Sequence, residues 1–257
     1  MSFSLTKWYL DVVTEAGAFA IAYWGEVRWG GLHLCFSAVQ SGARGAAAPW
    51  QTSARDFAPP SRDGSAIRWI AAPLDVRIDG HGTIPSVTQE LLATAQGRIS
   101  WCAELPRAAM RVQLGDRVLE GLGYVERLEL TMLPWRVPAD TIRWGRFVTA
   151  DVSMAWIDWK GDVPITHVFR DGARLERATV SDHTVGCPDG VTLTVNDSRV
   201  ITNDHVGGLL APLSALQSLM APIARLHQTR WLSRGTLTQP GRPPVVGWVI
   251  HELVTWQ

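Results

Sequence analysis

Residues 111–130 read RVQLGDRVLEGLGYVERLEL, and residues 234–256 read RGTLTQPGRPPVVGWVIHELVTW. Each stretch consists of a short β-forming run, a turn built on Gly with Asp or Pro, and a second run that carries a glutamate among apolar residues. These glutamates, Glu126 and Glu252, are separated by about half of the 257-residue chain. Internal repeats decide an architecture. This repeat predicts a tandem duplication of a β unit, in which each copy closes on a strand with an inward-pointing acid.

Strand-like patterns continue outward from these two stretches. Apolar and β-forming residues alternate or run together in short segments that Gly-containing turns divide. Residues 40–66, rich in Pro, Ser and Arg, are expected to form an irregular loop. Many short strands at such spacing are typical of a β-barrel or β-sandwich. The expected strands are 7–13, 18–29, 31–39, 67–71, 74–78, 98–104, 108–114, 122–131, 146–159, 164–169, 173–180, 190–195, 198–202, 230–237 and 245–256.

One segment has helical periodicity instead. In GLLAPLSALQSLMAPIARLH, leucines recur at helical spacing, and Pro212 and Pro222 are expected to trim the helix at both ends. We therefore expect an all-β chain with one helix near residues 208–227. The repeat divides the chain into two expected units, residues 1–131 and 132–257.

The composition excludes several classes of function. The 24 basic and 24 acidic residues cancel, whereas nucleic-acid binding normally needs a basic face. The three cysteines lie far apart, and no pair of histidines has the spacing of a metal site. No Gly-rich phosphate loop or serine-nucleophile motif occurs. We therefore expect no cofactor, no metal and no nucleic-acid partner.

Targeting signals are also missing from the pattern. The N-terminal residues lack a basic segment followed by an apolar core, and no run reaches the ~20 apolar residues that a transmembrane helix needs. A cytoplasmic protein without a transmembrane segment is the expectation.

Glu126 and Glu252 are the first candidates for catalysis. Alternation along a strand puts Glu126 on one face with Tyr124 and Leu128, and it puts Glu252 on one face with Trp248 and Ile250. Burial in an apolar barrel raises the pKa of a carboxyl group, and a protonated acid can protonate an alkene or enone. The alternative is that each glutamate is held in a structural ion pair, for which the candidate arginines are Arg127, Arg143, Arg146 and Arg230.

Two aspartates stand within aromatic strands. Asp158 alternates with Met154 and Trp156, which puts it on an apolar face and makes it a third catalytic candidate. The following Lys-Gly also permits an ordinary turn position for Asp158. Asp11, in the sequence WYLDV, is expected to bond to loop backbone instead.

The aromatic residues predict a pocket for a flat apolar ligand. The chain contains 13 tryptophans, and tryptophan buries a large area. An indole face also stabilises a neighbouring cation. Arg143 and Trp144 follow a Pro-rich connector, where they would either bind an anionic group or clamp the two units together. The expected substrate-binding residues are Trp8, Tyr124, Trp135, Arg143, Trp144, Trp156 and Trp248.

Several short motifs together resemble one family. They are WYLD (8–11), GLGYVE (121–126), PWRVPADTIRWGRF (134–147), AWIDW (155–159) and the terminal G-W-x-x-x-E (247–252). With these motifs the chain resembles the superfamily of carotenoid 1,2-hydratase (hydroxyneurosporene synthase) and AttH-like proteins, which are double lipocalin-like barrels. The segment GYVERL departs from the family pattern, because Glu126 replaces an Asp and the expected Asn is absent.

The resemblance implies two lipocalin-like antiparallel barrels in tandem and a hydrophobic small molecule as substrate or ligand. Relatives with this fold include hydratases, isomerases and cyclases, so the fold by itself does not choose the reaction. The first hypothesis is a cofactor-independent acid/base enzyme, a hydro-lyase, isomerase or cyclase, acting on an unsaturated terpenoid or polyketide. The alternative is a non-catalytic carrier of a lipid-like ligand. A third option is an interaction module with exposed tryptophans.

Overall fold

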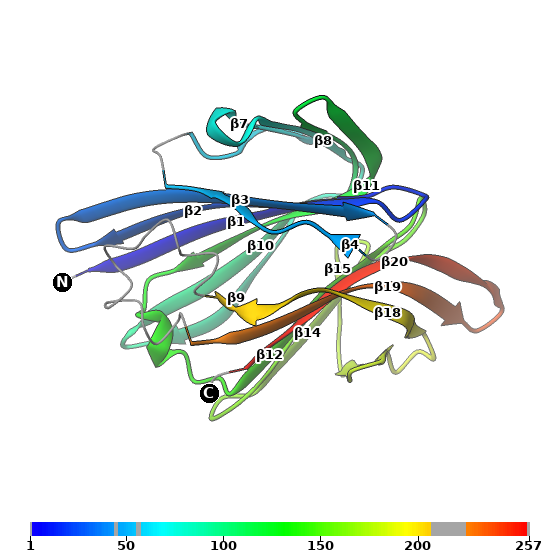
Figure 1. Cartoon of the computed structure of the whole chain (residues 1–257). Helices are drawn as coiled ribbons and strands as arrows, with labels where there is room; N and C mark the ends of the chain where they lie inside the picture. The colour runs from blue at the N-terminus through cyan, green and yellow to red at the C-terminus, as the bar shows by residue number, and fades with distance from the viewer. Residues whose placement is uncertain (1, 44–45, 55–57, 207–224, 256–257) are drawn as a thin grey trace. The chain divides into compact units, whose positions relative to one another are not determined.

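The computed structural model describes residues 2–43, 46–54, 58–206 and 225–255, and these residues form two antiparallel β-sheets (Figure 1). The elements of the first half are β1 (Phe3–Val13), β2 (Phe19–Trp29), β3 (Leu32–Ala43), β4 (Ala46–Ala47), β5 (Gln51–Ser53), β6 (Ser61–Asp63), β7 (Ala66–Ala71), the 3-10 turn η1 (Ala72–Leu74), β8 (Val76–Gly82), β9 (Val87–Thr94), β10 (Gly97–Leu114), β11 (Arg117–Leu130) and the 3-10 turn η2 (Pro134–Arg136).

The second half continues the same antiparallel pattern. Its strands are β12 (Thr141–Val148), β13 (Ser153–Lys160), β14 (Ile165–Arg170), β15 (Ala173–Leu175), β16 (Thr179–Val180), β17 (Thr184–Gly186), β18 (Thr192–His205), β19 (His227–Gln239) and β20 (Arg242–Thr255). The expected all-β class with two lipocalin-like units is confirmed. The helix expected near residues 208–227 lies almost wholly outside the described residues.

The chain divides into two compact units. The first comprises Met1–Val137 with Val206–Arg225, and the second comprises Pro138–His205 with Leu226–Gln257. The first unit has the strand order β4-β3-β2-β1-β11-β10-β8-β7-β6. In addition, β5 pairs with β3, and β9 pairs with β10. The second has the order β15-β14-β13-β12-β20-β19-β18-β17-β16.

The two units close in the same way. In the first, the opening strand β1 pairs antiparallel with β11, and in the second, the opening strand β12 pairs antiparallel with β20. Glu126 on β11 lies opposite Tyr9, and Glu252 on β20 lies opposite Trp144. The two glutamates that suggested the repeat therefore occupy corresponding places on the closing strands.

One face of each sheet carries an apolar core. In the first unit this face includes Trp8, Trp24 and Trp69, and in the second it includes Phe147 and Trp156. A side chain at position 145 would collide with the ring of Trp156. Gly145 therefore lets this large ring lie across β12, so the ring contributes to the core.

Several expected boundaries were wrong. The run 146–159 is two strands, because Thr149 turns the chain: its hydroxyl accepts from the Val152 N–H at 2.9 Å and donates to the Val152 carbonyl. Conversely, 98–104 and 108–114 are parts of the single strand β10, which is bulged near Leu105. Three short strands, β4 to β6, interrupt the expected 40–66 loop, and β9 was not expected. Among the described residues, no helix is long and apolar enough to cross a membrane.

Candidate functional site

A block of polar side chains is buried on the face of the first sheet opposite its apolar core. Strand pairing sets Tyr9 opposite Glu126 and Asp11 opposite Tyr124, so four polar side chains from β1 and β11 share one face. Asp11 is 1% exposed and Glu126 is 4% exposed. Asp11 lies within β1, two residues before the strand ends at Val13.

Glu126 is held by two neutral donors. The indole Nε1 of Trp101 donates to Glu126 Oε2 at 2.6 Å, and the hydroxyl of Tyr124 donates to the same oxygen at 3.0 Å. Trp101 comes from β10, where Ala103 lies opposite Glu126, so the indole reaches the carboxylate diagonally. Tyr124 was expected on this face, whereas the sequence contained no signal for Trp101, because pairing between distant strands cannot be read from alternation.

The environment of Tyr124 keeps its phenol protonated. Burial, and next the charge of Glu126, raise the pKa of Tyr124 well above its ordinary value of 10, and Asp11 and Tyr9 act in the same direction. Desolvation and neighbouring negative charge both disfavour the phenolate. Tyr124 therefore remains a hydrogen-bond donor over the whole neutral range.

Aromatic rings extend this block along β1 and β2. The rings of Tyr9 and Tyr23 meet edge to face with centroids 5.4 Å apart, and Tyr23 lies 5.6 Å from Trp50. The ammonium of Lys7 lies 5.4 Å from the centroid of the Tyr23 ring. We name Tyr9, Asp11, Tyr23, Trp101, Tyr124 and Glu126 the Glu126 cluster.

Glu252 has a different set of partners, although its position corresponds. It forms an ion pair with Arg230, whose Nε lies 3.0 Å from Oε2, and Gln228 Nε2 donates to the same oxygen at 2.6 Å. Arg230 is 0% exposed. Arg230, one of the arginines considered as partners for the two glutamates, thus pairs with Glu252.

Asp158 lies on β13 beside the apolar core of the second unit. It is 1% exposed, and its Oδ1 accepts from Lys160 Nζ at 2.8 Å and from Thr166 Oγ1 at 2.6 Å. Oδ2 is buried and has no hydrogen-bond partner among the described residues. Trp156, on the same face, belongs to that core.

The other expected binding residues have different neighbours within their own units. Trp8 lies in the apolar core of the first unit, with the Arg127 guanidinium 5.7 Å from its ring, and so on the face opposite Glu126. Trp135 in η2 meets Trp29 with centroids 5.7 Å apart. Arg143 donates to Asp182 at 2.8 Å.

Arg143 and Trp144, being neighbours on β12, point to opposite faces. Trp144 is buried opposite Glu252. The Arg234 guanidinium lies 3.7 Å from the centroid of the Trp248 ring.

A second polar group occurs on β19 and β20. Ser233 Oγ and His251 Nε2 are 2.9 Å apart, and the Trp231 and His251 rings stack at 5.0 Å. Burial, and next the charge of His183, lower the pKa of His251 to about 4, so its ring is neutral at pH 7. His251 points away from Glu252, as alternation along the strand predicted.

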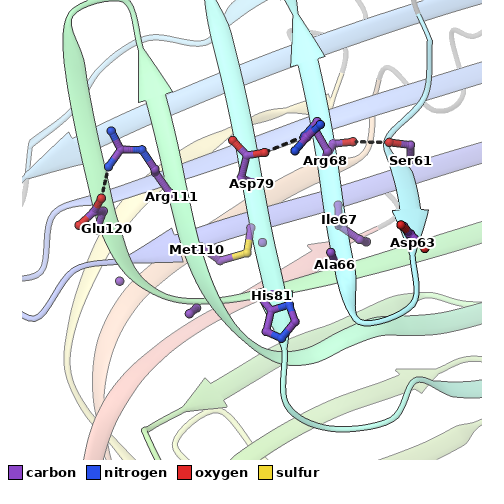
Figure 2. Close-up of a pocket in the computed structure, with 13 residues that line it drawn as sticks. Ser61, Asp63, Ala66, Ile67, Arg68, Asp79, His81, Met110, Arg111 and Glu120 are labelled. Atoms are coloured by element: carbon purple, nitrogen blue, oxygen red, sulfur yellow. Dashed lines mark hydrogen bonds and ion pairs between the residues drawn. The ribbon is translucent and has the colours of Figure 1, made fainter.

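An open hollow of about 580 Å³ lies over β6, β7, β8, β10 and β11 (Figure 2). Four alternating charges cross it in one cross-strand row, because Arg68 pairs with Asp79, Asp79 lies opposite Arg111, and Arg111 pairs with Glu120. Figure 2 shows His81 and Met110 beside this row. These four charges are engaged with one another across the strands, and Asp63 also lines the hollow.

Comparison with known proteins relates the chain to solved structures alone. No model of a known protein family matches it, and no curated protein matches its sequence. An AttH-like protein from Nitrosomonas europaea matches with a TM-score of 0.58 and 11% identity, covering 100% of this chain and 93% of that one. CghA, crystallised with Sch210972, matches with a TM-score of 0.62 and 11% identity, covering 99% and 89%.

Kievitone hydratase from Nectria haematococca gives a third match, with a TM-score of 0.56 and 8% identity, covering 98% of this chain and 88% of that one. At such low identity these likenesses concern the fold. The chain has the same fold as these three solved structures.

Proposed function

We propose that the chain is a cofactor-independent enzyme that hydrates, isomerises or cyclises an unsaturated hydrophobic small molecule. The observation that carries the proposal is the Glu126 cluster, in which a carboxyl group 4% exposed meets an indole and a phenol donor. A buried acid beside fixed donors is the arrangement that proton transfer to or from an apolar substrate requires.

Glu126 serves this chemistry because opposing effects act on its charge. Burial favours the protonated acid, whereas the hydrogen bonds from Trp101 and Tyr124 favour the carboxylate. A carboxyl group that is buried and hydrogen-bonded in this way can give a proton to one atom of a substrate and take a proton from another. Tyr124, which stays protonated, would then donate a hydrogen bond to a developing oxyanion.

The aromatic members of the cluster would hold the substrate. The ring centroid of Tyr23 lies 5.4 Å from that of Tyr9 and 5.6 Å from that of nearby Trp50. Such rings pack against an unsaturated chain and stabilise a cation formed on it. Holding a substrate in a folded conformation can contribute several kcal/mol to the rate, on the order of 7–11 in favourable cases.

The other two carboxylates fit structural roles better. The buried guanidinium of Arg230 favours the ionised form of Glu252, which leaves that carboxylate poorly suited to donating a proton. Asp158 is likewise engaged by a neighbouring side chain, in its ion pair with Lys160. We therefore assign the proton transfer to Glu126, and we assign Glu252 and Asp158 to the packing of the second unit.

The likeness to solved structures supports this choice of reaction class. One of the matched proteins is kievitone hydratase, and another, CghA, was crystallised with the small molecule Sch210972. Both have the fold of this chain without its sequence, so they support a small-molecule site and do not identify the substrate.

The test compares Glu126→Gln with Glu252→Gln. A small-molecule extract is incubated with each variant and with the wild-type chain, and mass spectrometry follows which compounds are consumed. We expect Glu126→Gln to slow conversion by at least about 100-fold, because a general acid or base contributes that much, while the compound still binds.

The control variant should behave differently. Glu252→Gln breaks the ion pair with Arg230 and so lowers stability, but the folded fraction should retain its turnover. Equal conversion by Glu126→Gln and the wild-type chain would refute the assignment.

A second candidate function, carriage of a lipid-like ligand, is favoured by the apolar core of the first unit. Ser37 Oγ and Trp69 Nε1 are buried there and have no hydrogen-bond partner among the described residues. A hollow of about 340 Å³, lined in part by Val39, Leu74 and Leu114, opens beside this core. Ordinary fatty acids that co-purify with the chain, with no compound consumed in the conversion test, would favour the carrier.

A further inference from the structure

Three potential metal ligands meet on the hairpin formed by β2 and β3, away from the Glu126 cluster. Glu26 on β2 lies directly opposite Cys35 on β3. His33 precedes Cys35 by two residues, so alternation puts all three side chains on one face of the hairpin. The carboxylate, imidazole and thiol atoms lie within 4.8 Å of one another. Figure 1 shows the two long strands side by side.

The distances between these atoms are close to those around a tetrahedral metal ion. His33 Nε2 is 2.7 Å from Glu26 Oε1 and 3.8 Å from Cys35 Sγ. Zinc bonds of about 2.0–2.3 Å imply ligand atoms roughly 3.3–3.6 Å apart. The observed distances lie on either side of this range, so shifts of less than about 1 Å in three side chains would complete the site.

We propose that Glu26, His33 and Cys35 bind one thiophilic divalent metal ion of the Zn²⁺ class, with water as the fourth ligand. One thiolate, one imidazole and one carboxylate form a donor set that suits zinc and that magnesium and calcium do not select. Cys35 is buried, whereas the His33 side chain is 44% exposed, so the ion can enter from solvent and keep a water ligand.

Glu26 supplies the carboxyl ligand atom, which Arg28 now contacts, with Arg28 Nη2 2.8 Å from Glu26 Oε1. The Arg28 side chain is 58% exposed and can move into solvent when a metal ion replaces it. Metal binding to Nε2 uses the neutral ring with its proton on Nδ1, and the thiol proton of Cys35 is released to solvent.

The ion would act as a clip on the β2–β3 hairpin. The three ligands come from two strands joined by a turn at Gly30 and Gly31, so one ion ties both strands together. Their spacing in the sequence matches no known metal motif, because strand pairing and not sequence proximity brings Glu26 to Cys35. The site is independent of the proposed function.

Cobalt is the probe of choice because a Co²⁺–thiolate bond produces a charge-transfer band in the near ultraviolet. The full chain is freed of metals with a chelator, kept reduced with a phosphine, and titrated with Co²⁺. We expect a band that saturates at one equivalent and that disappears on adding Zn²⁺. The Zn²⁺-loaded chain should have a higher melting temperature than the metal-free chain.

Variants decide whether the band arises from these residues. Cys35→Ser should abolish it, and His33→Ala, a change at an exposed position, should weaken Co²⁺ binding by about tenfold or more. Cys102→Ser is the matched control, because Cys102 is a second buried thiol of the first unit, bonded by Thr88, and should leave the band unchanged.

Two outcomes would overturn the proposal. One is a wild-type titration without a thiolate band. The other is a band that survives in His33→Ala with unchanged affinity, which would place the metal on other residues. Because His33 is largely exposed, a failure of that variant to fold is not expected, and its melting curve in metal-free buffer verifies this.

Discussion

At Glu126 and Glu252 the same side chain meets two different sets of donors. Glu126 receives hydrogen bonds from an indole and a phenol, and Glu252 receives them from a guanidinium and an amide. A neighbouring cation stabilises a carboxylate far more than a neutral donor does. The chemistry available to each glutamate therefore depends on its neighbours, although the strand positions correspond.

The residue whose replacement reports most directly on the Glu126 cluster is Tyr124. Tyr124→Phe removes one of the two described donors to Glu126 Oε2 and adds no bulk. We expect the free energy of unfolding, measured by urea titration, to fall by about 1–3 kcal/mol, because a buried oxygen loses its hydrogen bond.

A double-mutant cycle tests whether this effect acts through the carboxylate. In the Glu126→Gln background the same substitution should lower the free energy of unfolding less, because the carboxyl acceptor is already replaced by an amide. Additive losses in the cycle would show that Tyr124 stabilises the chain through other contacts.

Between elements, the ion pair of Arg230 on β19 with Glu252 on β20 joins neighbouring strands of the second sheet. Arg230 is 0% exposed, and the Glu252 carboxylate compensates its buried positive charge. Truncating one member of a buried ion pair lowers the free energy of unfolding more than replacing both members by apolar residues, because the remaining charge stays buried without a partner.

Substitutions in this pair should therefore be strongly non-additive. Glu252→Leu alone is expected to lower the free energy of unfolding by about 3–5 kcal/mol, and the double variant Arg230→Met with Glu252→Leu should recover much of that loss. Urea titrations of the two variants measure the difference. A double variant less stable than Glu252→Leu would contradict the assignment of a structural pair.

For the whole molecule, the partly buried His251 and the buried Tyr124 affect the pH range of highest stability. The pKa of His251 is lowered from 6.5 to about 4, so the unfolded chain binds the extra proton between these values. The contribution of His251 to the free energy of unfolding is therefore fully present above pH 6.5 and is lost as the pH falls toward 4. The pKa of Tyr124 is raised above 10, so its contribution is present below pH 10 and is lost at higher pH.

Urea midpoints measured across the pH range should be highest between about pH 6.5 and 9, because burial also raises the pKa values of Cys102 and Cys187 from 9.0. On the acid side the expected loss from His251 is on the order of 3 kcal/mol, since each pKa unit corresponds to about 1.4 kcal/mol. Replacing His251 with Gln should flatten the acid limb, and Tyr124→Phe should flatten the alkaline limb. A midpoint that rises steadily from pH 6.5 down to pH 4 would contradict the partly buried, neutral state of His251.

Within single strands, the sequence predicted the side-chain directions correctly. Glu126 shares a face with Tyr124, and His251 points away from Glu252, because alternation is a local property of any strand. The strand boundaries were less predictable. The turn at Thr149 uses a side chain hydrogen-bonded to backbone, and the run 146–159 gave no sign of it.

The all-β class, the repeat and the candidate acid Glu126 could be predicted from the sequence, because periodicity and turn chemistry depend on neighbouring residues. Only the tertiary structure decided that Trp101 meets Glu126, that Arg230 meets Glu252 and that Glu26 meets Cys35. The register between paired strands determines each of these meetings. Register depends on the packing of whole faces and on bulges such as that near Leu105, so no single stretch of sequence contains it.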